Sequence, residues 1–223
     1  MRIRKKQWTE DELENSKYLI RKPENFKGNW GSCFGKDAPV HIEIGCGKGG
    51  FITALSQKNP DISFIALERA SKIIVRSTRK AHILEESGEN ANNLRFILGD
   101  ANGLLDYFVP GEVDRIYLNF SDPWPNRKKW QKRRLTHRNF LNIYREILKN
   151  DGEIHFKTDN TQLFEFSLNE FATCGWKLSD ISLDLHNSQF HLNGENIMTE
   201  YEQKFAAGGI YRLVANTNSK LKQ

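Results

Sequence analysis

One loop of this sequence combines an acid, an aromatic ring and two prolines directly after an apolar run. Residues 116–120 read Ile-Tyr-Leu-Asn-Phe and predict a buried strand, and Asp122, Pro123, Trp124 and Pro125 follow. Proline cannot donate a hydrogen bond to a sheet, so the strand ends and a stiff loop presents the Asp122 carboxylate. Ligands bind at this end of the strands in open α/β sheets. We therefore expect Asp122 to lie in a binding site.

A run of basic residues follows this loop. Residues 127–138 contain no Asp or Glu and hold seven cations, Arg127, Lys128, Lys129, Lys132, Arg133, Arg134 and Arg138. The formal net charge is +5, and without this run 26 basic side chains face 28 acidic ones, a charge of −2. Positive charge concentrated in one stretch suits a phosphate backbone. The alternative, a solvated charge run beside a proline-rich turn, stays open.

A glycine-rich turn provides a second candidate site. Gly45, Gly47 and Gly50 match the pattern G-x-G-x-x-G between an expected strand and an expected helix. Glu68 lies 21 residues after Gly47, at the end of the next expected strand, where a carboxylate binds ribose hydroxyls. An NAD-dependent enzyme is therefore one interpretation.

Two further carboxylates favour a different cofactor. Glu43 stands two residues before Gly45, and it would repel a pyrophosphate by roughly 1–4 kcal/mol at short range. The same carboxylate would attract an ammonium group, which S-adenosylmethionine carries. Asp100 ends the third expected strand and is placed to accept a hydrogen bond from an adenine amino group. Three acids at successive strand ends therefore favour S-adenosylmethionine.

The elements that position these residues alternate between strand and helix. This order predicts the α/β class, with a doubly wound, mostly parallel sheet and an antiparallel C-terminal strand. Expected strands cover residues 40–44, 62–67, 94–98, 113–120, 153–157 and 177–185. Expected helices cover residues 51–58, 71–87, 103–108, 136–149 and 161–174. Residues 201–215 contain two alternating runs around a glycine pair and predict a hairpin-like pairing.

Composition excludes several classes of protein. The chain has 223 residues, of which 38% are hydrophobic and 27% charged, and its apolar runs are far shorter than the roughly 20 residues of a membrane span. The basic N-terminus has no apolar segment behind it, so we expect no secretory signal. Three cysteines and six histidines show no metal-ligand spacing. We expect a cytoplasmic protein with no membrane partner and no metal.

Five motifs in this order resemble the bacterial tRNA (guanine-N7)-methyltransferase family. They are E-I-G-C-G-K-G at 43–49, N-F-S-D-P-W-P at 119–125, K-R-R-L at 132–135, F-K-T-D at 156–159 and T-E-Y-E at 199–202. The resemblance implies a Rossmann-like class I methyltransferase fold. It implies transfer of a methyl group from S-adenosylmethionine to N7 of a guanine in the tRNA variable loop. We expect a basic arm at 1–37 (with Arg2, Arg4, Lys5 and Lys6), a methyltransferase domain at 38–217 and a tail at 218–223.

The resemblance also implies roles for individual residues. It makes Asp122 the catalytic residue. The cofactor would contact Glu43, Gly45, Gly47, Glu68, Asp100, Asn119 and Asp122. The tRNA would contact Asn126, Arg127, Lys128, Lys132, Arg133, Arg134, Asp159, Thr199, Glu200, Tyr201 and Glu202. Asn126 stands where many members carry a substrate-contacting Lys, and Arg127 and Lys128 are the alternatives for that contact.

Guanine N7 carries a lone pair and no proton, so we interpret Asp122 as an orienting and electrostatic group rather than a base. Three other interpretations stay open at this point. They are a methyltransferase acting on an adenine or cytosine amino group, an NAD oxidoreductase and a non-catalytic RNA-binding protein. The sequence is compatible with a monomer or a homodimer.

Overall fold

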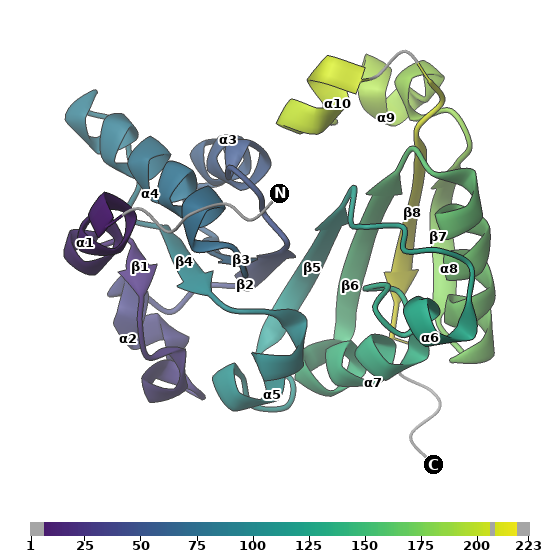
Figure 1. The fold of residues 1–223 in the computed structure, drawn as a ribbon, viewed down its shortest axis with the longest axis horizontal. Coiled ribbons are helices and arrows are strands. Elements are labelled where there is room, and N and C mark those ends of the chain that lie inside the picture. The colour runs from purple at the N-terminus through teal and green to yellow at the C-terminus, as the bar shows by residue number, and fades with distance from the viewer. Residues whose placement is uncertain (1–6, 206–207, 218–223) are drawn as a thin grey trace. The chain divides into compact units, whose positions relative to one another are not determined.

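The computed structural model describes residues 7–205 and 208–217 (Figure 1). Its contacts divide the chain into two compact units, Met1–Tyr107 and Phe108–Gln223. The expected basic side chains of the N-terminal arm and the expected C-terminal tail lie outside the described residues.

Unit 1 contains a parallel sheet in the order β1-β4-β3-β2. Its strands are β1 (Leu19–Ile20), β2 (Val40–Ile44), β3 (Ser63–Glu68) and β4 (Leu94–Leu98). Every residue of β2 is buried, and so are the first five of β3, as expected for parallel strands covered on both faces. The register places Ile44 beside Leu67 and Glu68 beside Leu98, so the three central strands end at one edge.

The helices of unit 1 follow from apolar stripes and local anchors. In α4 the buried residues Ile74, Val75, Ser77, Thr78 and Ala81 form one face against the sheet. Trp30, which is buried in α2, donates from Nε1 to the carbonyl of Tyr107 at 3.1 Å. The helices and 3-10 turns are α1 (Gln7–Asn15), η1 (Pro23–Phe26), α2 (Trp30–Phe34), α3 (Gly50–Lys58), α4 (Ser71–Glu86), η2 (Ala101–Gly103) and α5 (Leu104–Tyr107).

Unit 2 contains a mixed sheet in the order β5-β6-β8-β7. β5 and β6 are parallel, and β8 runs antiparallel to both β6 and β7. The strands are β5 (Val113–Asn119), β6 (Leu148–Thr158), β7 (Lys177–Ser182) and β8 (Tyr211–Asn216). The predicted antiparallel C-terminal strand is therefore present.

Two long helices pack on one face of this sheet. The ring of Phe164 in α8 stacks on Phe156 of β6 with centroids 6.2 Å apart, and α7 buries Phe140, Leu141, Tyr144 and Ile147. Shorter helices lie in the segments that connect the longer elements (Figure 1). The helices are α6 (Lys128–Gln131), α7 (Arg138–Ile147), α8 (Thr161–Thr173), η3 (Leu185–Asn187), α9 (Gln189–Leu192) and α10 (Glu200–Phe205).

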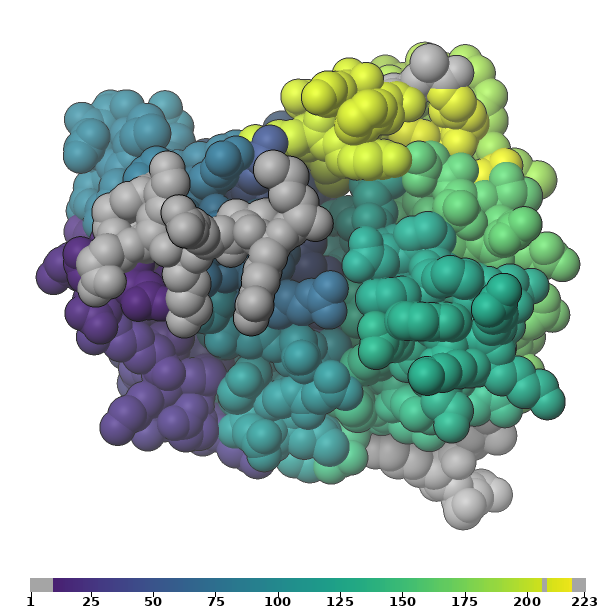
Figure 2. Space-filling view, in the orientation of Figure 1, coloured from purple at the N-terminus to yellow at the C-terminus, as the bar shows by residue number. Residues whose placement is uncertain are grey.

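The hairpin-like pairing predicted for residues 201–215 is wrong. Glu200–Phe205 forms α10, and Tyr211–Asn216 pairs with β6 and β7 instead of folding back on the preceding residues. Figure 2 shows part of the yellow C-terminal segment on the molecular surface, in agreement with the exposure of Tyr201 and Phe205. The expected helix at 136–149 is also too long, because the chain becomes extended at Leu148, where β6 begins.

Within the described residues, no helix has the length and apolar character needed to cross a membrane. Among the same residues, no three His, Cys, Asp or Glu side chains are grouped so that they could hold a metal ion.

Candidate active site

The glycine-rich turn of unit 1 adopts a backbone that favours glycine. Gly45, Gly47 and Gly49 have φ values of 79°, 57° and 75°, in the left-handed region. The amides of Gly45 and Cys46 donate to the carbonyl of Leu67 at 2.8 and 2.9 Å, which fixes the turn to the end of β3. A Cβ added at Gly45 or Gly47 would meet no atom within 4 Å, so both positions border open space.

Helix α4 contacts the same glycine-rich turn through Ser77. The Ser77 hydroxyl donates to the carbonyl of Gly47 at 2.9 Å, and Ser77 is fully buried. A Cβ at Gly49 would lie 2.8 Å from the Cβ of Ser77, so the helix and the turn are in close contact. The prediction from sequence missed Ser77, because a serine inside an apolar helical stripe carries no signal of its target.

Glu68 joins the glycine turn to the end of β3. Its Oε2 accepts from the amide of Gly47 at 3.2 Å, and its Oε1 accepts from the amide of Ala70 at 2.9 Å. An ionised carboxylate has about four acceptor positions, so these two bonds leave capacity for ligand hydroxyls. Glu68 is thus both a structural part of the turn and an available acceptor.

The other two acids of unit 1 differ in burial. Glu43 is buried, whereas Asp100 is exposed after β4. Oδ1 of Asp100 accepts from the amide and the side chain of Asn102 at 2.8 and 2.9 Å, which caps η2. Burial and the negative charges of Glu43 and Glu68 raise the pKa of the Cys46 thiol well above its usual value. Cys46 is therefore protonated, and the two glutamates lie close to it.

Tyr107 borders Asp100 and was not predicted. A Cβ added at Gly99 or Gly103 would approach the Tyr107 hydroxyl to 2.9 or 2.6 Å, so the two glycines make room for this ring. Burial and the charge of Asp100 raise the pKa of Tyr107. The hydroxyl therefore stays a neutral donor beside the carboxylate.

In unit 2 the loop after β5 carries Asp122, and we call residues 120–126 the Asp122 loop. Phe120 and Trp124, on either side of Asp122, have φ values of 49° and 36°, which are unusual for residues other than glycine. The amide of Phe120 donates to the carbonyl of Lys157 at 2.9 Å and extends the pairing of β5 with β6 by one residue. Asp122 itself is exposed.

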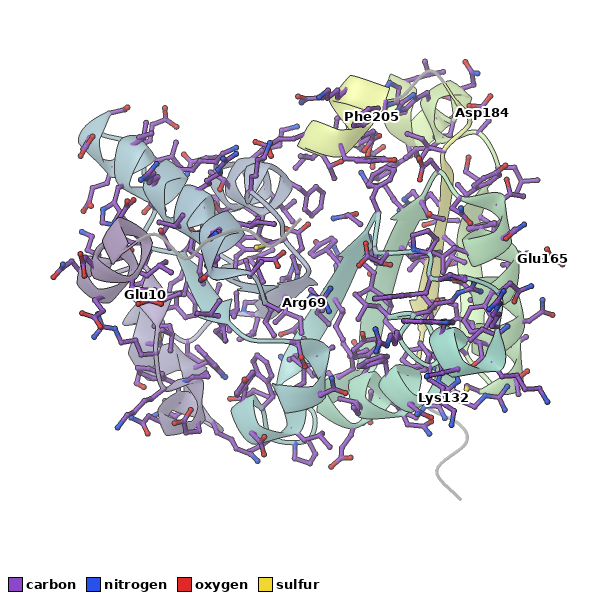
Figure 3. All side chains as sticks on the ribbon, viewed as in Figure 1. Glu10, Arg69, Lys132, Glu165, Asp184 and Phe205 are labelled. Atoms are coloured by element: carbon purple, nitrogen blue, oxygen red, sulfur yellow. The ribbon has the colours of Figure 1, made fainter. Side chains whose placement is uncertain are left out.

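The basic run after the loop is folded around aromatic rings. Trp124 and Trp130 stack with centroids 5.4 Å apart and planes 8° from parallel. The guanidinium of Arg133 lies 4.8 Å from the Trp124 ring and 4.6 Å from the Trp130 ring. Exposed side chains in this stretch are those of Asn126, Arg127, Lys128, Lys129, Lys132 and Arg133. Lys132, which directly follows α6, is labelled in Figure 3.

Arg134 differs from its basic neighbours because it is buried. Only 2% of its surface is exposed, and its Nη2 and Nε donate to the carbonyl of Trp124 at 2.8 and 3.3 Å. The guanidinium lies 4.5 Å from the ring of Phe166 in α8. The structure therefore does not place Arg134 with the exposed cations of this run. A charge run gives no indication of which member turns inward.

A buried ion pair connects β6 with α10. Nζ of Lys157 donates to Oε2 of Glu202 at 2.8 Å, and Glu202 has no exposed surface. The other oxygen of Glu202 accepts from Asn196 at 2.8 Å and lies 2.9 Å from Nε2 of His186. Burial raises the pKa of Glu202, but the Lys157 charge and the hydrogen bonds from Lys157, Asn196 and His186 outweigh burial and hold this pKa below its usual value.

The T-E-Y-E motif is a helix start. The amide of Glu202 donates to Oγ1 of Thr199 at 2.9 Å, and the amide of Thr199 donates to Oε2 of Glu202 at 3.3 Å. These reciprocal bonds form a capping box, whose signature is Ser or Thr followed three residues later by Glu. Thr199 and Glu202 are buried, so neither presents its side chain as an exposed tRNA contact.

The middle of the motif faces outward. The hydroxyl of Tyr201 donates to Oδ2 of Asp159 at 2.9 Å, and the Tyr201 ring lies 5.0 Å from Phe120. This hydrogen bond, together with burial, raises the pKa of Tyr201. Glu200 is half-buried at the start of the helix. Unit 2 therefore brings together the Asp122 loop, the end of β6 and α10.

Comparison with solved structures defines the class of protein. The fold matches that of a 16S rRNA (adenine(1408)-N(1))-methyltransferase from Catenulisporales acidiphilia, solved with cosubstrate SAM, with a TM-score of 0.60. The two chains are 12% identical, and the match covers 88% of this chain and 93% of the other. The fold is therefore that of the class I methyltransferases, as predicted.

Sequence comparison identifies the family. A family model described as "Putative methyltransferase" matches residues 37–213. The tRNA (guanine-N(7)-)-methyltransferase of Bacillus subtilis (strain 168) is 50% identical over 215 residues, covering 95% of this chain and 97% of the relative. The protein of the same name from Clostridioides difficile (strain 630) is 48% identical, covering 94% of each chain. The chain belongs to the tRNA (guanine-N(7)-)-methyltransferase family, which confirms the predicted resemblance.

Proposed function

We propose that this protein transfers the methyl group of S-adenosylmethionine to N7 of a guanine in the variable loop of tRNA. The observation that carries this proposal is the match to relatives of that name, which covers 94% or more of this chain. Because the proposed substrate is a tRNA, we also propose that the protein acts in the cytoplasm.

The residues of unit 1 fit S-adenosylmethionine. Gly45 and Gly47 leave open space where a Cβ would stand, so a ligand can approach the backbone of the turn. In our proposal Glu43 attracts the ammonium group, Glu68 accepts from the ribose and Asp100 accepts from the adenine amino group. A dinucleotide would bring phosphates to these acids, which disfavours the NAD alternative. When bound, S-adenosylmethionine supplies an electrophilic methyl group on its sulfonium.

The chemistry needs positioning more than proton transfer. Guanine N7 has a free lone pair, so no base has to remove a proton before methyl transfer. The purine becomes cationic as the bond forms, and its Watson–Crick edge becomes a better hydrogen-bond donor. We assign Asp122 to accept from that edge, because a fixed carboxylate stabilises developing positive charge. Asp159, oriented by the Tyr201 hydroxyl, is the second candidate for this contact.

The exposed cations of the basic run suit the tRNA backbone. Arg127, Lys128, Lys132 and Arg133 have exposed side chains, and each phosphate contact would release counterions. We retain Asn126, Asp159, Glu200 and Tyr201 as proposed tRNA contacts, and Asn119 as a proposed cofactor contact. Thr199 and Glu202 act in our proposal by building α10.

One experiment tests the proposed activity. The protein is incubated with labelled S-adenosylmethionine and an unmodified tRNA transcript, and the product nucleoside is identified by mass spectrometry. We expect 7-methylguanosine in the variable loop, and loss of product when that guanine is replaced by adenine. A methylated adenine or cytosine, or binding of tRNA without methyl transfer, would contradict the proposal.

A further inference from the structure

The backbone of the Asp122 loop is strained on both sides of the acid. Among the described residues, the non-glycine positions with positive φ are Phe120, Trp124 and Asp180. Two of these three flank Asp122, and both carry bulky aromatic side chains. Such conformations cost free energy and persist only where the surroundings enforce them. The loop therefore needs contacts that hold it.

The first end of the loop is held by β6 and α10. The amide of Phe120 donates to the carbonyl of Lys157 at 2.9 Å. The ring of Phe120 lies 5.0 Å from that of Tyr201. These contacts fix the residue that precedes Ser121 and Asp122.

The second end is held by Arg134. Two guanidinium nitrogens donate to the carbonyl of Trp124, the strained residue itself, at 2.8 and 3.3 Å. Hydrogen bonds from a charged donor are stronger than those between neutral groups. Within the described part of the chain the guanidinium has no carboxylate partner, and Phe166 supplies its other contact at 4.5 Å.

Burying an arginine without a carboxylate is costly, which lowers the pKa of Arg134. The adjacent Arg133 has an exposed side chain, which contacts the rings of Trp124 and Trp130. The two neighbouring residues are therefore both arginines but differ in burial. An arginine that is 2% exposed and whose guanidinium donates to a loop carbonyl is unsuited to contact a phosphate. It is suited to hold the loop.

We propose that Arg134 is a positioning residue, which holds the carbonyl of Trp124 and so keeps Asp122 in place for methyl transfer, and that it does not contact tRNA. The catalytic part of this inference rests on the proposed function. The structural part, restraint of the loop by Arg134, does not.

The test compares three variants with the parent. Arg134→Met removes the charge and both donors, and Arg134→Gln keeps one amide donor that can reach the same carbonyl. Arg145→Met is the matched control, because Arg145 is an exposed arginine of α7 that bonds the carbonyl of Cys174, away from the loop. Hydrogen–deuterium exchange of peptides covering residues 120–127 is measured without ligands. Single-turnover methylation is measured at saturating tRNA and cofactor, and the tRNA dissociation constant is measured at several salt concentrations.

We expect Arg134→Met to accelerate exchange in the loop peptide and to lower the single-turnover rate about 10- to 100-fold, the scale of a small misplacement of a reacting group. The salt dependence of tRNA binding should equal that of the parent, because no phosphate contact is lost. Arg134→Gln should recover part of both losses, and Arg145→Met should match the parent in all three measurements.

Two results would overturn the inference. One is an unchanged exchange rate of the loop peptide in both Arg134 variants. The other is a salt slope reduced by about 0.7–0.9, the value for one lost phosphate contact, with the parent rate at saturating tRNA. Exchange is read without substrate, so it remains decisive even if the parent does not methylate guanine. If Arg134→Met fails to fold, Arg134→Gln carries the same comparison.

Discussion

Replacing Lys157 with Met should destabilise unit 2 strongly. The change leaves Glu202 buried, with its hydrogen bonds from Asn196 and His186 but without its cation. Removing one member of a buried pair typically costs about 3–5 kcal/mol, because the remaining charge is desolvated and uncompensated. For a protein of this size we expect a loss of roughly 6–20 °C in the midpoint of thermal unfolding.

The matched control is Lys149→Met. Lys149 also pairs with an acid in unit 2, Asp114, at 2.7 Å, but its side chain is 45% exposed, whereas that of Lys157 is 7% exposed. Exposed pairs contribute about 0–1 kcal/mol, so this variant should unfold close to the parent. Both are measured by urea titration and by thermal unfolding of the full chain. Similar losses in the two variants would refute the reasoning from burial.

The pH dependence gives a second test with a defined sign. In the parent the pKa of Glu202 is lowered, so its pairing stabilises the fold above the unfolded pKa of about 4.3. This contribution is lost as the pH falls through the folded pKa. In Lys157→Met burial remains and the opposing charge is gone, so the pKa of Glu202 should rise above the unfolded value. The variant should then lose less stability than the parent, or gain stability, between pH 7 and pH 5.

His186 also faces Glu202, with its Nε2 2.9 Å from Oε1 of the carboxylate. The double variant Lys157→Met with Glu202→Gln tests whether the unpaired charge causes the loss, because it removes the buried carboxylate as well as its cation. We expect it to be more stable than Lys157→Met at pH 7. A double variant less stable than the single one would mean that packing, and not the lone charge, causes the loss.

Three predictions concern the proposed reaction. Asp122→Asn keeps the shape and removes the charge, so the single-turnover rate should fall roughly 10²–10³-fold, and a rate near that of the parent would exclude an electrostatic role. Glu68→Ala should weaken S-adenosylmethionine binding by roughly 1–3 kcal/mol in calorimetry, and unchanged affinity in a folded variant would remove Glu68 from the site. Ser77→Ala loses the bond to Gly47, so it should weaken cofactor binding by about 0.5–1.5 kcal/mol, while an equal loss of tRNA affinity would argue against a local effect.

The central strands and the glycine turn were predictable because their signals are local. A run such as Ser63–Glu68 is apolar until its last residue, and its burial follows from that composition alone. The left-handed backbone at positions 45 and 47 favours glycine, and the sequence has glycine at both positions. Positions of Glu43, Glu68 and Asp100 on neighbouring strands then follow from the order of the elements.

The short elements were not predictable in the same way. β1 has two residues and pairs with Phe96 and Ile97, so tertiary contacts rather than local preference produce it. Residues 201–215 predict a hairpin-like pairing because two alternating runs flank a glycine pair. The competing signal, a capping box from Thr199 to Glu202, was present in the sequence and determines the structure.

The burial of Arg134 and Lys157 could not be read from the sequence at all. Both belong to residue types that are almost always exposed, and each occurs beside other cations or polar residues. Their burial depends on partners distant in the chain, Phe166 for Arg134 and Glu202 for Lys157. Residue type thus predicted a basic surface at 127–138, while the contacts assign one of its members, Arg134, to an internal position.

The buried Lys157–Glu202 ion pair explains how the T-E-Y-E motif both begins α10 and presents Tyr201 on the surface. Lys157 lies two residues before Asp159, and its partner Glu202 follows Tyr201. The ion pair therefore fixes the end of β6 against α10 at the point where Tyr201 and Asp159 meet on the surface. Thr199 and Glu202 face inward because they are three residues apart on a helix, which turns Tyr201 outward. A buried pair of this kind adds little net stability compared with apolar residues. Its value here lies in register, since a shift of α10 by one residue would separate Tyr201 from both Asp159 and Phe120.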